Sequence, residues 1–419
     1  MVEKKLNDYM HGFIVDICNK IGPREAGTKQ EEFAGNKIEE ELKKFCDETH
    51  QEEFICSPTA FLGFVRYGAL MALFSVILYW LSLLVDLGWL QIDNIFSLIF
   101  IVIAVILLGI TVPYFIFEII RYFEFYDFMF PKKKSKNVIG TINPTDKVKN
   151  TIIFSGHHDS AYEFNLFYYL KRIGQMMINI GLLEVFTLFF LVVLKLIFYF
   201  LPIDITMIFL GFGIAFLTLL PVAFLFMFFH TYNPVLGAFD NLSGVVILLG
   251  IGKYLYENKN NEKFFPKHTK IHLVSFAAEE AGLRGSKRYV KAHYDELKEN
   301  GTIIVNMDGI AKTEKLLIIS KEPFIGAKYN PEIYNPILKI ASDLKLNIKT
   351  GPLSFGATDG AAFVRKGLPA VTISGLDLKE ELPPFYHTRE DKPEVVDKES
   401  LGQVLEICLN YIKLIDSSN

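Results

Sequence analysis

Four long apolar runs interrupt a chain that otherwise mixes polar and apolar positions. Three of them contain no Asp, Glu, Lys or Arg: residues 67–85, 94–117 and 205–230. The fourth, residues 173–203, contains only Glu184 and Lys195. Because a membrane-crossing helix needs roughly 20 apolar residues, each run is long enough to span a bilayer. The pattern predicts four transmembrane helices, paired into two hairpins by the short connections 86–93 and 202–204.

The three remaining stretches alternate short β-rich runs with helical patterns. They cover residues 1–60, 122–170 and 231–419. The candidate strands are residues 151–155, 270–276, 302–306, 316–320 and 370–374. The candidate helices are residues 31–45, 241–257, 284–299, 331–344 and 400–415. This alternation predicts an α/β domain with a mixed, largely parallel sheet flanked by helices. The two hairpins, within residues 61–121 and 171–230, would interrupt that single domain.

Lysines and arginines beside the apolar runs predict the orientation, since cytoplasmic flanks carry an excess of both. The two hairpin connections are acidic and lack Lys and Arg. The opposite ends carry Arg66, Arg121, Lys171, Arg172 and the lysine-rich run 132–136. Each hairpin returns to the side on which it starts, so all three polar stretches face that side. We therefore expect a multi-pass integral membrane protein whose polar domain is cytoplasmic.

Three charged features near the apolar runs need explanations of their own. The run 132–136 is interpreted as a topology anchor beside anionic lipid headgroups. Lys195 is expected to extend its ammonium group outward from the end of its helix. Glu184 is 11 positions from Lys195, about three helical turns away, so the two cannot pair directly. Glu184 keeps two interpretations, a functional carboxylate or a protonated or hydrogen-bonded packing residue.

Composition and charge exclude several classes of protein. An apolar fraction of 51% together with 21% charged residues fits neither an ordinary soluble enzyme nor a wholly membrane-embedded protein. A net charge of −4 and only one short basic run argue against nucleic-acid binding. The four cysteines show neither metal-type nor disulfide-framework spacing. The first residues lack the apolar core of a signal peptide, so we expect no export by that route.

Acidic and imidazole side chains follow the predicted strands, where α/β proteins place their sites. The set comprises His157, Asp159, Asp240, Glu279, Glu280, Asp308 and His387. Each alone has an ordinary explanation, because an Asp before a helix is usually a cap and a lone His usually a satisfied loop residue. Together, two imidazoles and three carboxylates can form two metal sites that share a bridging carboxylate. The pattern therefore favours metal-assisted hydrolysis.

The motifs that contain these residues resemble those of the M28 family of co-catalytic zinc peptidases, which includes aminopeptidases and carboxypeptidases. The resemblance covers GlyProArg at 22–24, HisHisAsp at 157–159, GlyAlaPheAspAsnLeuSerGly at 237–244, GluGluAlaGlyLeuArgGlySer at 279–286, AsnMetAspGly at 306–309, ThrAspGlyAlaAlaPhe at 358–363 and TyrHisThr at 386–388. These motifs occur in the family's order. Phe239 departs from the pattern, because the family usually has an acid there.

The resemblance implies a metal cage and a set of supporting roles. Two divalent ions, expected to be zinc, would be bound by His157 with Asp308 and by Glu280 with His387, and Asp240 would bridge them.

The resemblance also implies the roles of three residues next to these ligands, and the alternation of side chains along a strand implies that of a fourth. Glu279 would be the general base that takes a proton from the attacking water and passes it to the leaving amine. Asp159 would fix the imidazole of His157. Asp359 would support the site, and His158, facing the other way on its strand, would not be a ligand.

The sequence thus predicts a membrane-bound two-metal exopeptidase, with aminopeptidase activity expected and peptides as substrates. Its main departure from the family is an insertion of a whole hairpin between His157 and Asp240, which are 83 positions apart. From this topology we predict an active site that opens near the membrane surface and acts on peptides close to the bilayer.

Three other functions are each compatible with part of the sequence. A single-zinc glutaminyl-cyclase-like aminoacyl transferase shares the architecture, but this chain retains both pairs of metal ligands. An inactive peptide-binding scaffold would generally have lost ligands, and none is lost here. A transporter with a regulatory domain would rest mainly on Glu184, and no inverted repeat is evident.

Overall fold

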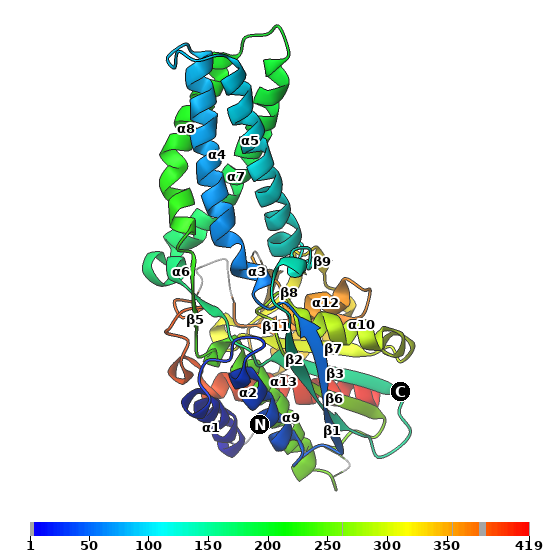
Figure 1. Cartoon of the computed structure of the whole chain (residues 1–419). Helices are drawn as coiled ribbons and strands as arrows, with labels where there is room; N and C mark the ends of the chain where they lie inside the picture. The colour runs from blue at the N-terminus through cyan, green and yellow to red at the C-terminus, as the bar shows by residue number, and fades with distance from the viewer. Residues whose placement is uncertain (1–3, 262, 354, 377–382, 419) are drawn as a thin grey trace. The chain divides into compact units, whose positions relative to one another are not determined.

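The computed structural model describes residues 4–261, 263–353, 355–376 and 383–418 (Figure 1). These residues form two compact units. The first, which we call the sheet unit, comprises Met1–Pro58, Phe130–Glu163 and Tyr232–Asn419. The second, which we call the helical unit, comprises Thr59–Met129 and Phe164–Thr231. The chain therefore leaves the sheet unit twice to build the helical unit.

The sheet unit is built on a nine-stranded mixed sheet, counted over the described residues. Its strands are β1 (Glu48–Cys56), β2 (Lys133–Ile142), β3 (Asn150–His157), β6 (Thr269–Phe276), β7 (Ile303–Asp308), β8 (Leu317–Glu322), β9 (Ala327–Lys328), β10 (Lys349–Pro352) and β11 (Ala370–Ser374). The order is β1-β2-β6-β3-β7-β11-β8-β10, with β9 paired to β8. The four central strands β6, β3, β7 and β11 run parallel to one another. A parallel centre places the carboxyl ends of these strands at one edge, where sites form in open α/β sheets.

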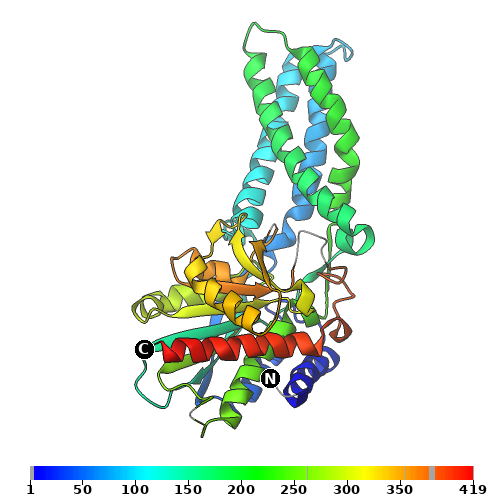
Figure 2. The same cartoon turned by 180° about the vertical axis from the view of Figure 1, so that it is seen from behind.

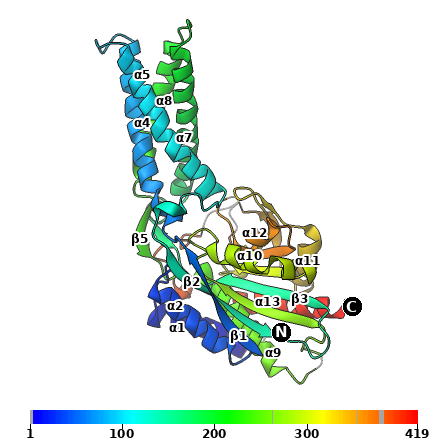
Figure 3. The same ribbon diagram turned by 45° about the vertical axis from the view of Figure 1, so that its right-hand side comes forward.

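Helices pack on both faces of this sheet. Their bounds are α1 (Lys4–Lys20), α2 (Lys29–Leu42), α9 (Ser243–Glu257), α10 (Arg284–Glu299), α11 (Pro331–Asp343), α12 (Asp359–Val364) and α13 (Lys398–Ser417). Helix α9 packs on β3, β6 and β7, and α1 and α13 pack on α9; Figure 2 shows α13 in red, running across the sheet. Helices α10 and α12 pack on each other and on strands of the sheet (Figure 3). Because strands buried on both faces favour apolar residues at most positions, the central strands contribute many buried apolar side chains to the core.

The predicted fold class is confirmed, since the sheet is mixed, mostly parallel and flanked by helices. All five predicted strands are present, within two residues of their expected bounds. In the sheet unit, the pattern missed α1, α12, β1, β2, β9 and β10. Strand β1 was missed because its sequence, ETHQEEFIC, is mainly polar, and only Phe54 and Cys56 are buried, as is usual at the edge of a sheet.

The helical unit contains four long helices, α4 (Val65–Asp86), α5 (Ile95–Pro113), α7 (Arg172–Tyr199) and α8 (Thr206–Phe226), side by side in Figure 1. The segments Ala60–Asp86, Ile95–Ile120 and Arg172–Tyr199 are each long and apolar enough to cross a membrane. Helix α8 meets the same test if its two parts, bent by 48° between Leu217 and Leu220, count as one span. Many side chains on the outside of the unit are large and apolar, with Phe190 64% exposed and Leu183 67% exposed.

A fifth segment, Ala238–Glu257, is also long and apolar enough to cross a membrane, but it differs from the other four because it is buried inside the sheet unit. In Ala238–Glu257, 89% of the apolar window is buried. This segment includes α9, which packs against the strands of the sheet unit. It is therefore the core helix that the sequence pattern placed at residues 241–257.

The boundaries of the inserted segments differ from the predicted ones. Residues 122–129 and 164–170, assigned by the sequence to the polar stretches, belong to the helical unit. Tyr126 shows the reason, because its hydroxyl donates to the carbonyl oxygen of Ile110 at 2.8 Å and so folds this segment back onto α5. The last apolar helix ends at Phe226, and His230 begins strand β5 (His230–Pro234), which pairs with β4 (Tyr162–Phe164).

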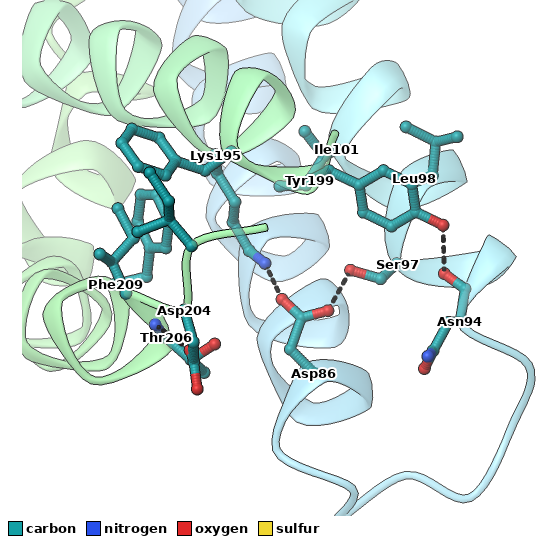
Figure 4. A pocket seen from close by; sticks show the side chains of 13 residues that line it. Asp86, Asn94, Ser97, Leu98, Ile101, Lys195, Tyr199, Asp204, Thr206 and Phe209 are labelled. Atoms are coloured by element: carbon teal, nitrogen blue, oxygen red, sulfur yellow. Dashed lines mark hydrogen bonds and ion pairs between the residues drawn. The ribbon is translucent and has the colours of Figure 1, made fainter. Parts of the chain in front are cut away.

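Lys195 does not extend outward, so that prediction was wrong. Its side chain is only 6% exposed and its ammonium group forms an ion pair with Asp86, at the end of α4 (Figure 4). The hydroxyl of Ser97 donates to the other carboxylate oxygen of Asp86 at 2.6 Å. Burial favours this pairing, because a charge removed from water is costly unless a partner compensates it. The ion pair links α4 of the first hairpin to α7 of the second.

Two other charged features lie apart from this pair. Glu184 is 4% exposed, and neither of its carboxylate oxygens has a hydrogen-bond partner among the described residues. A hydrogen-bonded packing role therefore has no partner to support it in the described part of the chain. In the lysine-rich run 132–136, Lys134 pairs with Glu53 at 2.7 Å and Lys136 with Glu32 at 2.9 Å. These two lysines thus bridge elements of the sheet unit.

Candidate metal centre

The predicted site residues lie at the carboxyl edge of the parallel strands. His157 is the last residue of β3 and Asp308 the last residue of β7. Glu279 and Glu280 follow β6 after two alanines, in the turn before α10. Because β6, β3 and β7 are neighbours and run parallel, these four side chains are brought to one place by the sheet alone.

Asp240 and His387 reach the same place from loops. Asp240 lies at the start of the segment that leads into α9, with non-helical φ and ψ angles of −117° and 90°. His387 has a φ of +51°, in the left-handed region that non-glycine residues rarely adopt, and its ring stacks on Tyr386 with 4.0 Å between centroids. Such backbone conformations persist when the surrounding contacts over-determine them.

Asp240 faces both imidazoles. Nε2 of His157 lies 3.1 Å from Oδ1 of Asp240, and Nε2 of His387 lies 3.1 Å from Oδ2. Nε2 of His387 is also 3.3 Å from Oε1 of Glu280. Each oxygen of Asp240 therefore points to a different histidine, as a bridging carboxylate requires.

The remaining acids complete two sets of potential ligands. Ligand atoms of His157, Asp240 and Glu280 all lie within 4.8 Å of one another, and so do those of His157, Glu279 and Asp308. The structure thus brings all five predicted ligands together. It also places Glu279 within ligand distance, so its assignment as a base and not a ligand stays a prediction.

Burial and crowding of like charges govern the electrostatics of this cluster. Burial raises the pKa of Glu279 well above its usual range, and the nearby acids Glu280, Asp359 and Asp308 raise it further. Burial also raises the pKa of Asp308, with Asp240 adding to the effect. Burial alone would lower the pKa of His387, but the carboxylates of Glu280 and Asp240 outweigh it and raise that pKa to about 10. The site therefore concentrates more negative charge than its imidazoles balance.

These residues fit a pair of divalent metal ions. Imidazole nitrogens and carboxylate oxygens are the donors that zinc accepts beside thiolates. The buried Oε1 of Glu280 receives no hydrogen bond among the described residues, which suits an oxygen that a metal would bind. Bound cations would also relieve the mutual repulsion of the buried carboxylates.

Asp159 supports the site in a way that the sequence did not reveal. Its two oxygens accept hydrogen bonds from the backbone N–H groups of Glu279 and Glu280, both at 3.0 Å. Its Oδ1 lies 3.4 Å from Nδ1 of His157, which is the contact that the resemblance implied. Glu31, which no motif marked, accepts from the N–H of Ala278 at 3.1 Å. Two buried carboxylates thus hold the turn that carries Glu279 and Glu280.

Other predicted neighbours occupy the expected surroundings. His158 faces away from the cage, with Nδ1 2.9 Å from the hydroxyl oxygen of Ser275, and its exclusion from the ligands stays a prediction. Asp359 is fully buried, and its charge contributes to the raised pKa of Glu279. Asp391, the last residue of the HisThrArgGluAsp segment, was given no role, yet it binds the backbone at Asp240.

Fold and cage together define the class of protein, an α/β fold with a candidate two-metal site at the carboxyl edge of its sheet. Residues 223–412 match the family model for peptidase family M28. This part of the chain is therefore similar to peptidase family M28.

Two named proteins are similar to parts of this chain. The chain is 29% identical over 175 residues to the aminopeptidase YwaD of Bacillus subtilis (strain 168), an alignment that covers 40% of this chain and 35% of YwaD. It is 23% identical over 192 residues to a glutamate carboxypeptidase 2 homolog of Caenorhabditis elegans, covering 41% of this chain and 25% of that protein. The chain thus spans about a third or less of the length of these relatives.

Solved structures share the fold. The zinc aminopeptidase BSAP from Bacillus subtilis has a TM-score of 0.55 at 14% identity, with 98% of this chain and 94% of that chain covered. A glutaminyl cyclase from Bacteroides thetaiotaomicron has a TM-score of 0.54 at 15% identity, with 100% and 99% covered. Identities this low compare the folds alone.

Proposed function

We propose that this chain is a membrane-bound, two-metal exopeptidase, and an aminopeptidase in the first place. The observation that carries the proposal is Asp240, whose two oxygens face His157 and His387 at 3.1 Å each. That arrangement supports a shared carboxylate between one ion at His157 and Asp308 and another at Glu280 and His387. The likeness to the aminopeptidase YwaD supports the choice of activity.

The chain's own groups supply the remaining parts of the mechanism. Bound divalent ions would polarise the scissile carbonyl group and make the attacking water more acidic. Glu279 would accept the proton of that water at a carboxylate oxygen and deliver it to the leaving amine. Asp159 would hold the backbone of Glu279 and Glu280 through its two N–H acceptors, which keeps the base next to the cage.

The helical unit supports the membrane part of the proposal. We propose that α4, α5, α7 and α8 span the bilayer as two hairpins and that the sheet unit is cytoplasmic. The outward apolar side chains support contact with lipid, because soluble surfaces rarely carry large contiguous apolar patches. The Lys and Arg residues at the ends opposite the hairpin connections support the orientation. Substrates would then be peptides that the cytoplasm or the membrane supplies.

A direct test measures bound metal and peptide cleavage on the full chain in nanodiscs. Free, amino-blocked and carboxyl-blocked peptides are compared, with zinc, cobalt and manganese each supplied in turn. Two metal ions per chain, with cleavage of amino-free but not amino-blocked peptides, are expected. No cleavage of any peptide by the metal-loaded chain would refute the proposal.

One alternative has an observation of its own, the similarity in fold to glutaminyl cyclases. A cyclase of this kind would need only one zinc ion. Asp240, Glu280 and His387 could hold it, since Nε2 of His387 lies 3.1 Å from Asp240 and 3.3 Å from Glu280. The retention of His157 and Asp308 beside that group favours the peptidase. Cyclisation of peptides with N-terminal glutamine, in the absence of peptide-bond hydrolysis, would decide for the cyclase.

A further inference from the structure

Two buried charged residues that belong to no predicted ligand set hold the loop of Asp240 from opposite sides. They are Arg24 and Asp391, and both are fully buried. The loop, residues 236–241, has irregular backbone geometry, including a φ of +59° at Gly237. Within the segment, the N–H of Leu242 donates to the carbonyl oxygen of Gly237 at 3.2 Å and that of Ser243 to the carbonyl oxygen of Ala238. These bonds shape the segment but do not tie it to the rest of the site, so its position depends on the side chains around it.

Arg24 binds the carbonyl side of the loop. Its Nη1 donates to the carbonyl oxygen of Leu236 at 2.6 Å, and its Nη2 donates to that of Gly237 at 3.0 Å. Its Nε donates to the carbonyl oxygen of His158 at 2.7 Å. Arg24 therefore fastens the start of the Asp240 loop to the segment that contains His157.

Asp391 binds the amide side of the same loop. Its Oδ1 accepts from the N–H of Phe239 at 2.6 Å, and its Oδ2 accepts from the N–H of Asp240 at 3.1 Å. Asp391 lies four residues after His387, and its own N–H donates to the carbonyl oxygen of Thr388 at 3.0 Å. Asp391 therefore fastens the end of the Asp240 loop to the segment that contains His387.

These contacts explain how the segments that contain His157, Asp240 and His387 are held in fixed positions relative to one another. His157 is fixed by β3, but Asp240 and His387 lie in loops that no sheet hydrogen bond positions. Hydrogen bonds with one charged partner are each stronger than neutral ones, and here five of them act on buried backbone groups. A bridging carboxylate needs both of its oxygens at defined distances, so small loop movements would change the separation of the two ions.

We propose that Arg24 and Asp391 are positioning residues that set the separation of the two metal ions, by fixing the Asp240 loop to the segments of His157 and of His387. This inference rests on the proposed two-metal function. It assigns to neither residue any contact with substrate or metal. A purely structural role for both residues is the competing explanation.

The chain provides a matched control for that explanation. Asp416 also holds two consecutive backbone N–H groups, those of Lys267 at 2.8 Å and His268 at 2.7 Å. Like Asp391 it accepts from two consecutive N–H groups, although it is half-buried and also accepts from the hydroxyl of Thr269 at 2.8 Å. The segment that it holds contains no predicted ligand. Loss of stability alone should affect both substitutions, whereas loss of metal geometry should affect only Asp391.

The test compares the full chain with Arg24→Lys, Asp391→Asn and Asp416→Asn in nanodiscs. Lysine keeps the charge but has a single ammonium group and cannot reach three carbonyl oxygens in the planar geometry of arginine. Asparagine keeps one acceptor and turns a donor toward the second N–H. The zinc affinity of each site is measured by competition with a chelator. The coordination geometry is followed by the visible absorption of the cobalt-substituted protein. Peptide cleavage at a series of substrate concentrations gives kcat and KM separately.

We expect Arg24→Lys and Asp391→Asn to weaken the more loosely bound zinc ion by roughly 10- to 100-fold, the usual effect of losing a group that orients metal ligands. Their cobalt spectra should change, and kcat should fall by a larger factor than KM rises. Asp416→Asn should match the wild type in all three measurements. If Asp391→Asn does not fold, Asp391→Glu, which keeps both acceptors, is measured in its place with the same expectation.

Wild-type zinc affinity and an unchanged cobalt spectrum in both variants would overturn the inference. An equal loss in Asp416→Asn would overturn it as well, because the effect would then be general. If the wild type binds two zinc ions but cleaves no peptide, the proposed function fails while the comparison of affinities still decides this inference. A wild type that binds no metal refutes both.

Discussion

Nε2 of His387 lies 3.1 Å from Oδ2 of Asp240, although 147 positions separate the two residues in the sequence. His157 makes the corresponding contact with Oδ1, so the carboxylate is enclosed between two imidazoles. The surrounding acids Glu279, Glu280 and Asp308 are buried and repel one another. Bound cations would compensate this repulsion between carboxylates. The stability of the folded protein should therefore depend on bound metal ions.

Removal of metal should destabilise the sheet unit. At a zinc concentration about 100 times the dissociation constant, binding to the folded state alone stabilises it by about 2.7 kcal/mol. A strong chelator should abolish this contribution and lower the melting temperature. The measurement is a thermal unfolding curve with and without chelator, followed by addition of zinc. Asp240→Asn serves as the control, because it should lose most of the response; identical curves for the wild type would contradict a resident metal.

Glu279→Gln should separate the roles of base and ligand. If Glu279 transfers the proton, its amide analogue should lower kcat by roughly 10²- to 10⁴-fold while both metal ions stay bound. Cleavage and metal content are measured on the same sample, with the exposed Glu299→Gln as control. Loss of one metal ion in Glu279→Gln would instead make Glu279 a ligand, an outcome that its position within 4.8 Å of His157 and Asp308 also permits.

Much of this site could be predicted because its chemistry follows regular elements. His157 and Asp308 end parallel strands, and Glu279 and Glu280 follow another, so the hydrophobic pattern alone places them at one edge. Motifs added Asp240 and His387, which no periodic pattern locates. The four long apolar helices could also be predicted, because a run of their length with at most two charged residues leaves few other structures.

The parts that could not be predicted depend on contacts between distant segments. Asp391 and Arg24 act on backbone groups about 150 and 210 positions away, and nothing near either residue marks its partner. Lys195 was expected in water because the sequence of neither helix shows how α7 packs against α4. That packing is what brings Lys195 to Asp86. Strand β1 was missed because an edge strand needs no apolar alternation.

Stability at mildly acidic pH should depend on His272. Burial lowers the pKa of His272 to about 4, and the neighbouring charges of Lys270, His293 and His50 act in the same direction. The unfolded chain, with a pKa near ~6.5, then binds more protons than the folded one between these two values. Stability contributed by neutral His272 is complete above pH ~6.5 and is lost as the pH falls toward ~4.

His272→Gln should remove this dependence. Between pH 7 and pH 5 the wild type should lose about 2 kcal/mol more stability than the variant. Denaturant unfolding at a series of pH values measures the difference, and the hydrogen bond between Thr141 and Nδ1 of His272, at 3.0 Å, can be replaced by the glutamine amide. If the stability of the two proteins changes in the same way with pH, His272 is protonated as easily in the folded protein as in the unfolded one, and the prediction is wrong.

Replacement of Lys195 tests the link between the two hairpins. Lys195→Met would leave Asp86, whose side chain is 23% exposed, without its cation. We expect a loss of about 1–3 kcal/mol, between the values for an exposed pair and for a fully buried one. The double variant Lys195→Met with Asp86→Asn should recover most of that loss, because asparagine is neutral and still accepts from Ser97. Unfolding in detergent measures all three proteins, with Lys392→Met, which breaks an exposed pair with Glu390, as a control expected to change stability by less than about 1 kcal/mol. If Lys195 instead extended its ammonium group into water, Lys195→Met would be as mild as the control, and the double variant would recover nothing.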